Sequence, residues 1–171
     1  MTRAQRRFLL VDQCIVVGVI NFFLNAAIAW NLFRAVERVP MTGGSQNVLS
    51  DVLGTFFLLP LILCLIITAL VRRQVRSGKL AALHWDRVTH PLYRRLPASA
   101  FLRGLALAVT CTIALGLPVF GLMAALGVTS VTYWELIIAK GVYSGVLAAA
   151  VSPVIAYAAL GDRLDVPPTT A

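Results

Sequence analysis

Four stretches of mostly apolar residues, each about 20 residues or longer, alternate with polar segments along the chain. An α-helix rises about 1.5 Å per residue, so each stretch is long enough to cross a hydrocarbon core of roughly 30 Å. The pattern therefore predicts an all-α integral membrane protein with four transmembrane helices. We place these helices at about 10–33, 52–72, 104–126 and 135–160.

The connectors between the predicted helices alternate between short and long. This spacing predicts two helical hairpins, joined by a basic linker at 72–103 within one membrane domain of 1–171. Residues 37–47, in the first connector, are rich in turn-forming types and show no hydrophobic period, so they predict a loop. Ser50 or Asp51 is then a suitable N-cap for the second helix.

The basic residues predict how the helices are oriented. Of 15 Lys and Arg residues, eight lie within 72–103 and three precede the first helix. Basic residues that flank membrane helices are retained on the cytoplasmic side. We therefore expect a cell membrane, such as a bacterial inner membrane, with both termini and the linker in the cytoplasm.

The composition supports a membrane protein and argues against a nucleic-acid partner. The chain is 59% hydrophobic and 13% charged, whereas soluble proteins average about 45–50% and 25%. The positive charge follows the helix ends, so its expected partner is a bilayer with anionic headgroups. We expect an interfacial helix at 77–88. The basic residues expected to contact anionic lipid are Arg72, Arg73, Arg76, Lys79, Arg94 and Arg95.

Small and amide side chains form a stripe on the first and on the fourth predicted helix. The first stripe contains Cys14, Gly18, Asn21, Asn25 and Ala29. The fourth helix carries Gly141, Gly145, Ala148, Ser152, Ala156 and Ala159 on one face. Small residues let helix backbones approach closely in lipid, so both stripes predict helix-packing surfaces. Whether they meet each other or a second copy of the chain is left open by the sequence.

Five polar or charged residues lie within the predicted membrane helices or at their ends: Asp12, Asn21, Asn25, Asp51 and Lys140. For the two asparagines we favour hydrogen bonds between helices, and the alternative is a polar lining for a substrate path. An ion pair between Asp51 and Lys140 is the preferred interpretation of these two charges. Separate snorkelling and a role in transport or binding are the alternatives. Asp12 is expected to pair with nearby Arg residues at headgroup level.

The sequence contains no pattern that predicts catalysis. No nucleophile elbow, P-loop, metalloprotease helix or dinucleotide fingerprint occurs, and the residues carry no motif of a known family. The three cysteines fall in predicted helices without a CxxC pair, and both histidines, His84 and His90, lie in the linker. We therefore expect no enzyme activity, no cofactor and no metal site.

Three classes of function fit these observations, and the one with least support is a membrane-embedded enzyme or cofactor carrier that would use Asp12, Asp51 or the loop histidines. The stripes favour an assembly or accessory subunit that acts through helix–helix contacts, with itself as a homo-oligomer or with another membrane protein. The alternative is a small oligomeric transporter or channel that uses Asn21/Asn25 and Asp51/Lys140. Its support is these polar groups, the prolines at 60, 118 and 153, which predict bent helices, and a weak similarity between the two hairpins.

Overall fold

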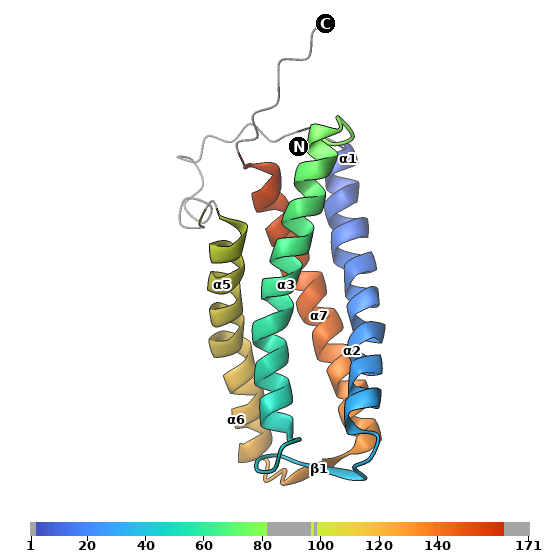
Figure 1. Ribbon diagram of the computed structural model, residues 1–171, viewed down its shortest axis with the longest axis vertical. Helices are drawn as coiled ribbons and strands as arrows, with labels where there is room; N and C mark the ends of the chain where they lie inside the picture. Colours follow the sequence, from blue (N-terminus) through green and yellow to red (C-terminus); the bar gives the residue numbers. More distant parts are fainter. Residues whose placement is uncertain (1–2, 82–96, 98, 163–171) are drawn as a thin grey trace, which may run out of the picture.

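The computed structural model describes residues 3–81, 97 and 99–162, and the statements below refer to these residues. Within them, four long apolar helices pack as an all-α bundle, which confirms the predicted fold (Figure 1). The first is continuous through α1 (Arg3–Arg7), the π-helix η1 (Phe8–Val16) and α2 (Val17–Phe33). The second is α3 (Val48–Arg76). The third joins α5 (Ala100–Cys111), the π-helix η2 (Thr112–Gly116) and α6 (Leu117–Ala125), and the fourth is α7 (Tyr133–Leu160).

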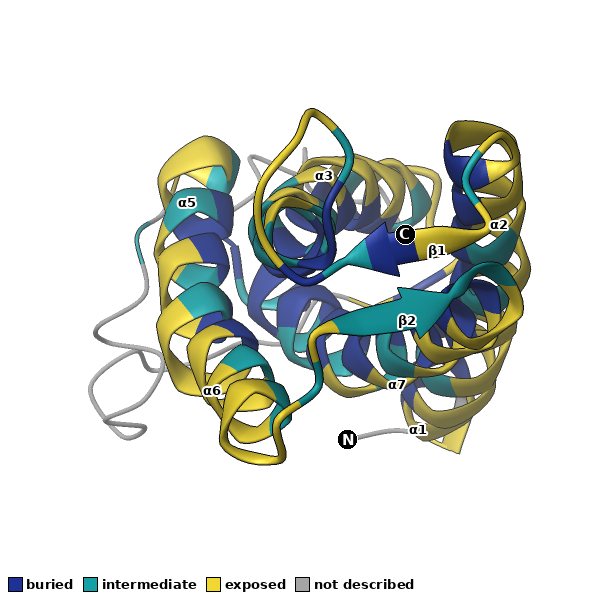
Figure 2. Cartoon of the chain, turned by 90° about the horizontal axis from the view of Figure 1, so that it is seen from below, coloured by how far each residue is buried: buried dark blue, intermediate teal, exposed yellow. Residues whose placement is uncertain are grey.

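Two short strands join the connectors at one end of the bundle. β1 (Arg38–Pro40) pairs antiparallel with β2 (Ser130–Thr132), with Val39 opposite Val131. Figure 2 looks onto this end, which we call the strand end, and shows the pair lying across it. The opposite end, where α3 and α7 finish, is the terminal end. The prediction of a loop throughout 37–47 is therefore wrong. Backbone groups of the first short connector form hydrogen bonds with backbone groups of the other, and this pairing makes Arg38–Pro40 a strand.

Helices α3 and α7 begin earlier than predicted because residues before them act as side-chain caps. The Asn47 side chain accepts a hydrogen bond from the Ser50 backbone N–H at 2.9 Å, so α3 starts at Val48 and the expected cap at Ser50 or Asp51 is wrong. A capping box between Thr132 and Glu135 starts α7. The linker between α3 and α5 is correspondingly shorter than 72–103. The predicted interfacial helix at 77–88 extends outside the described residues.

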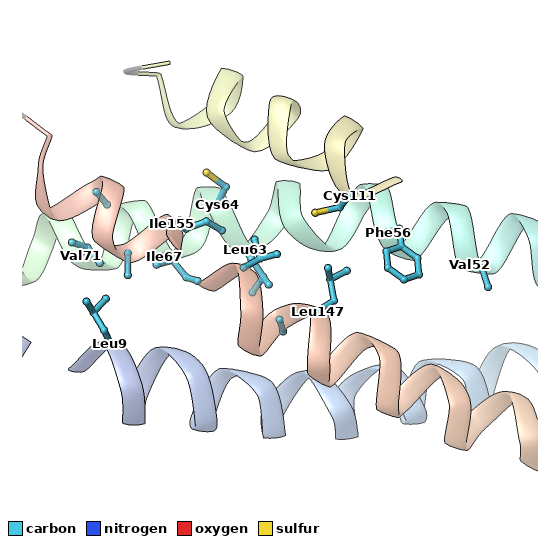
Figure 3. Packing of buried hydrophobic residues seen from close by; sticks show 14 of the residues in the cluster. Leu9, Val52, Phe56, Leu63, Cys64, Ile67, Val71, Cys111, Leu147 and Ile155 are labelled. Carbon is cyan, nitrogen blue, oxygen red and sulfur yellow. The ribbon is translucent and has the colours of Figure 1, made fainter. Parts of the chain in front are cut away.

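Helix α7 is the central element of the bundle. It packs against α2 on one side and against α3 on the other, and α3 packs in turn against α5. Figure 1 shows α7 behind the gap between α3 and α2. Buried apolar side chains such as Leu63, Ile67, Leu147 and Ile155 fill the contact between α3 and α7 (Figure 3). The outward faces of the helices are exposed (Figure 2). Many of the exposed residues are large and apolar, as expected for helices in contact with lipid.

The two stripes of small residues meet within one chain. A Cβ atom built on Gly145 would lie 3.1 Å from the backbone oxygen of Gly18, and one on Gly141 would lie 3.1 Å from the Phe22 ring. A Cβ atom at Gly145 would crowd the backbone of α2, and one at Gly141 would crowd the Phe22 ring, so glycine at both positions lets α2 and α7 approach closely. The predicted packing residues Gly18, Gly141, Gly145, Ala148 and Ser152 are all buried.

Candidate functional site

A groove of 680 Å³ runs between α2 and α3, which do not pack closely against each other. We call it the α2–α3 groove. Its walls are branched aliphatic side chains such as Leu24 and Ile28 on α2 and Ile62 and Ile66 on α3. These wall residues are also exposed on the outer surface of the bundle. The groove is therefore open toward the space that lipid would occupy.

The close contact between α2 and α7 explains why this groove exists. The glycines of both stripes let α2 approach α7, whereas α3 contacts α7 through large side chains on another of its faces. Two helices packed against different faces of a third are held apart, and α7 separates them. Lys140, on α7, lines the groove between them.

The polar centre of the groove is an ion pair between α7 and α3. Lys140 Nζ donates to Asp51 Oδ1, and both side chains are only 5% exposed. The Tyr143 hydroxyl donates to Asp51 Oδ2 at 3.1 Å, and its ring stacks on Phe56 with centroids 5.4 Å apart. The preferred interpretation of Asp51 and Lys140 as a pair that links the two hairpins is therefore confirmed. Both residues also line the groove.

Asn21 and Asn25 line the same groove, and their hydrogen bonds differ from the prediction. Asn21 Nδ2 donates to the Val17 carbonyl at 2.8 Å, and Asn25 Nδ2 donates to the Asn21 carbonyl at 3.0 Å. Both bonds lie within α2, so the expected bonds between helices are not formed within the described part of the chain. Each side-chain amide donates to a carbonyl of its own helix, and its side-chain oxygen accepts no hydrogen bond from a described residue.

The depth of these groups follows from the antiparallel packing of α2 and α7. Gly145 lies against Gly18 and Phe22, and Gly141 lies against the Phe22 ring. Lys140, one residue closer to the strand end than Gly141, is therefore at about the depth of 22–25 on α2. It lies about 10 Å along α7 from Tyr133, since each residue adds about 1.5 Å. The asparagines and the ion pair thus form one polar belt across the groove.

Gln13 is a groove residue that sequence reasoning missed. It lies in the π-helix η1, its side chain is 7% exposed, and it lines the terminal half of the groove. Its Oε1 atom is buried and has no hydrogen-bond partner among the described residues. Gln13 precedes Asn21 by eight residues, about two helical turns. This spacing was the available signal that both residues lie toward the same side of the helix.

A second ionic cluster ties the terminal end together. Asp162 accepts hydrogen bonds from Arg72 at 2.8 Å and from Arg103 at 2.6 Å, with Arg103 almost fully buried. Sequence reasoning missed Asp162 and placed Arg72 and Arg103 in the linker. Arg72, expected at lipid headgroups, therefore has a partner inside the protein. Arg73, Arg76 and Lys79 are exposed as lipid contact requires, and Arg94 and Arg95 lie outside the described residues.

The other predicted groups give no further site. Asp12 is exposed on η1 and forms no ion pair with any described residue, so its expected pairing with Arg6, Arg7 or Arg72 is not seen. Cys14, Cys64 and Cys111 are unpaired thiols. No protein-family model matches this chain, and comparisons with curated proteins and with solved structures find no match either.

Proposed function

We propose that the protein is a small membrane transporter whose substrate, an amphiphile with one long apolar chain, binds in the α2–α3 groove. One observation carries this proposal. Four of the five polar residues singled out by the sequence, Asn21, Asn25, Asp51 and Lys140, line a single groove with apolar walls. Apolar pockets with a few convergent polar groups are the usual form of small-molecule sites.

The dimensions of the groove favour a chain over a helix as its occupant. Between Gln13 and Phe33, α2 rises about 30 Å along the groove, so the groove is long enough for an extended chain. Its volume of 680 Å³ is within the usual range of small-molecule sites, about 300–1,000 Å³, whereas a helix about 30 Å long and about 10 Å wide fills about 2,400 Å³. The groove therefore accommodates one extended hydrocarbon chain.

The packing of the small-residue stripes weakens the proposal of an accessory subunit. That proposal was based on these stripes as surfaces for another protein, but they pack against each other inside the chain. An accessory role would require another contact surface.

We place the terminal end of the bundle in the cytoplasm. The exposed Arg73, Arg76 and Lys79 at this end support that orientation, because basic residues are retained on the cytoplasmic side. A Ser77→Cys variant should then react with a membrane-impermeant thiol reagent only after cells are permeabilised. A Ser45→Cys variant at the strand end should react in intact cells, and the reverse pattern would refute the orientation.

Photolabelling tests whether the groove holds a chain. The full-length protein in nanodiscs is irradiated with a single-chain amphiphile that carries a diazirine near the end of its chain, and labelled peptides are mapped by mass spectrometry. We expect label on the groove faces of α2 and α3. Ile62→Trp should remove it by filling the groove, whereas Leu65→Trp, on an exposed face of α3 outside the groove, should not. Equal labelling of Ile138 and Val146, which are exposed on α7 outside the groove, would refute the proposal.

Transport is measured separately with the protein in liposomes. A single-chain amphiphile with a fluorescent headgroup is quenched from outside, and the quenched fraction reports its movement between leaflets. We expect faster movement with the unaltered protein and with Leu65→Trp than with Ile62→Trp. Equal rates for all three proteins would leave a binding site without transport.

A further inference from the structure

The ion pair in the groove lies where a bound headgroup reaches both charges. Asp51 and Lys140 both line the groove, and 5% of each side chain is exposed. The strand end of the groove is also polar, with Ser45, Gln46 and Asn47 at its rim. From this end toward the terminal end the α3 wall becomes aliphatic as far as Leu70. The groove therefore has a polar head region at the strand end and a mostly aliphatic chain region, in which Gln13 is a polar exception.

We propose that the α2–α3 groove selects a zwitterionic amphiphile, whose headgroup carries an ammonium group close to a phosphate or carboxylate group. This inference depends on the proposed function and names its substrate class. On binding, the ammonium of the headgroup pairs with Asp51 and the anionic group pairs with Lys140. The internal ion pair is exchanged for two pairs with the ligand, and no bond other than hydrogen bonds and ion pairs changes.

Charge balance distinguishes this headgroup from the others. The unliganded pair has no net charge, so a headgroup with one charge of each sign can open it and leave every charge paired. A headgroup with a single charge pairs with one residue and leaves the other without a partner in a low-dielectric site, which is costly. An uncharged headgroup offers no charge to replace either partner, so it binds beside a closed pair.

The residues around the pair favour the same exchange. The Tyr143 hydroxyl stays on Asp51 Oδ2 when Lys140 leaves Oδ1, so the carboxylate is held in place and remains partly satisfied. Asn21 and Asn25 line the groove at about the same depth, and their side-chain oxygens accept no hydrogen bond from a described residue. An ammonium group has three donors, so one carboxylate and two amide oxygens complete its hydrogen bonds.

Competition between headgroups tests the inference. Single-chain amphiphiles with the same chain but different heads compete with the diazirine probe for the groove of the full-length protein in nanodiscs. The heads are phosphoethanolamine, phosphoglycerol, a primary ammonium and uncharged glycerol. We expect the zwitterionic phosphoethanolamine head to compete about tenfold better than either singly charged head, which corresponds to about 1.4 kcal/mol. Equal competition by all four, or a preference for the anionic head, would overturn the inference.

Two double variants show whether the preference depends on the ion pair. Asp51→Lys/Lys140→Asp keeps one charge of each sign in the groove and should retain part of the preference, because Tyr143 then has no carboxylate at position 51 to hold. Asp51→Asn/Lys140→Met removes both charges and should reduce the preference to about equal competition. If the exchanged variant does not fold, the neutral variant decides the matter, since a preference that survives in it contradicts the inference. If the unaltered protein is labelled in the groove but shows no headgroup preference, this inference fails and the proposed function stands. If the unaltered protein shows no groove labelling, the inference and the proposed function are both refuted.

Discussion

Replacing Gly145 by alanine tests the contact that separates α2 from α3. A Cβ atom at this position would lie 3.1 Å from the Gly18 oxygen and 3.1 Å from the Phe22 Cβ, where ordinary contacts begin near 3.4 Å. One neighbour is backbone and the other is the first atom of a side chain, so neither moves unless the helix moves. The substitution therefore forces α2 and α7 apart over their shared face.

The expected cost is a difference between two terms. Inserting a methyl group into a well-packed contact costs about 1–3 kcal/mol. Alanine also favours a helix over glycine by about 1 kcal/mol, which offsets part of that cost. We expect Gly145→Ala to lower the free energy of unfolding by up to about 2 kcal/mol. Gly121→Ala is the matched control, because a Cβ at this helical glycine of α6 meets nothing within 4 Å. It should be neutral or stabilising by up to about 1 kcal/mol.

Reversible unfolding by SDS in mixed micelles, followed by circular dichroism, measures both variants against the unaltered protein. The sign of the effect should differ between the two glycines. If Gly145→Ala is as stable as Gly121→Ala, the two helices do not approach as closely as described, and the explanation of the groove is wrong.

Three further tests use the same unfolding assay to measure the buried polar contacts. Lys140→Met should cost about 3 kcal/mol because Asp51 loses its buried partner, and adding Asp51→Asn should recover most of that loss; no recovery would contradict the pairing. Asp162→Asn should also cost about 3 kcal/mol, mainly through the 2%-exposed Arg103, and an effect below about 0.5 kcal/mol would show that this contact stabilises little. Tyr143→Phe should cost about 1 kcal/mol by removing one hydrogen bond to Asp51, and a neutral result would exclude that bond.

Helix number and the packed faces were predictable because both follow from local chemistry. An apolar stretch must satisfy its own backbone in lipid, so each long stretch forms a helix. Gly18 and Gly145 carry no side chain, so each marks a helix face on which another helix can approach closely, whichever helix that is. The Asp51–Lys140 pair was also accessible, since both charges follow polar connectors at the same end of two predicted helices.

The partners of these faces were decided only by the tertiary structure. Helical period says which residues share a face, but not which helix lies opposite, so the meeting of the two stripes could not be read from the sequence. The same holds for Asp162, whose partners Arg72 and Arg103 are far away in the chain. The strand pair was missed because three-residue strands carry too little periodicity to detect.

The sequence by itself determined four membrane-length helices, their polar positions and the asymmetry of basic charge, because these depend on residue type and local spacing. The groove depends on something else. It exists because close packing of α2 on one face of α7 and of α3 on another holds these two helices apart, and only the three-dimensional arrangement brings Asn21, Asn25, Asp51 and Lys140 to one surface.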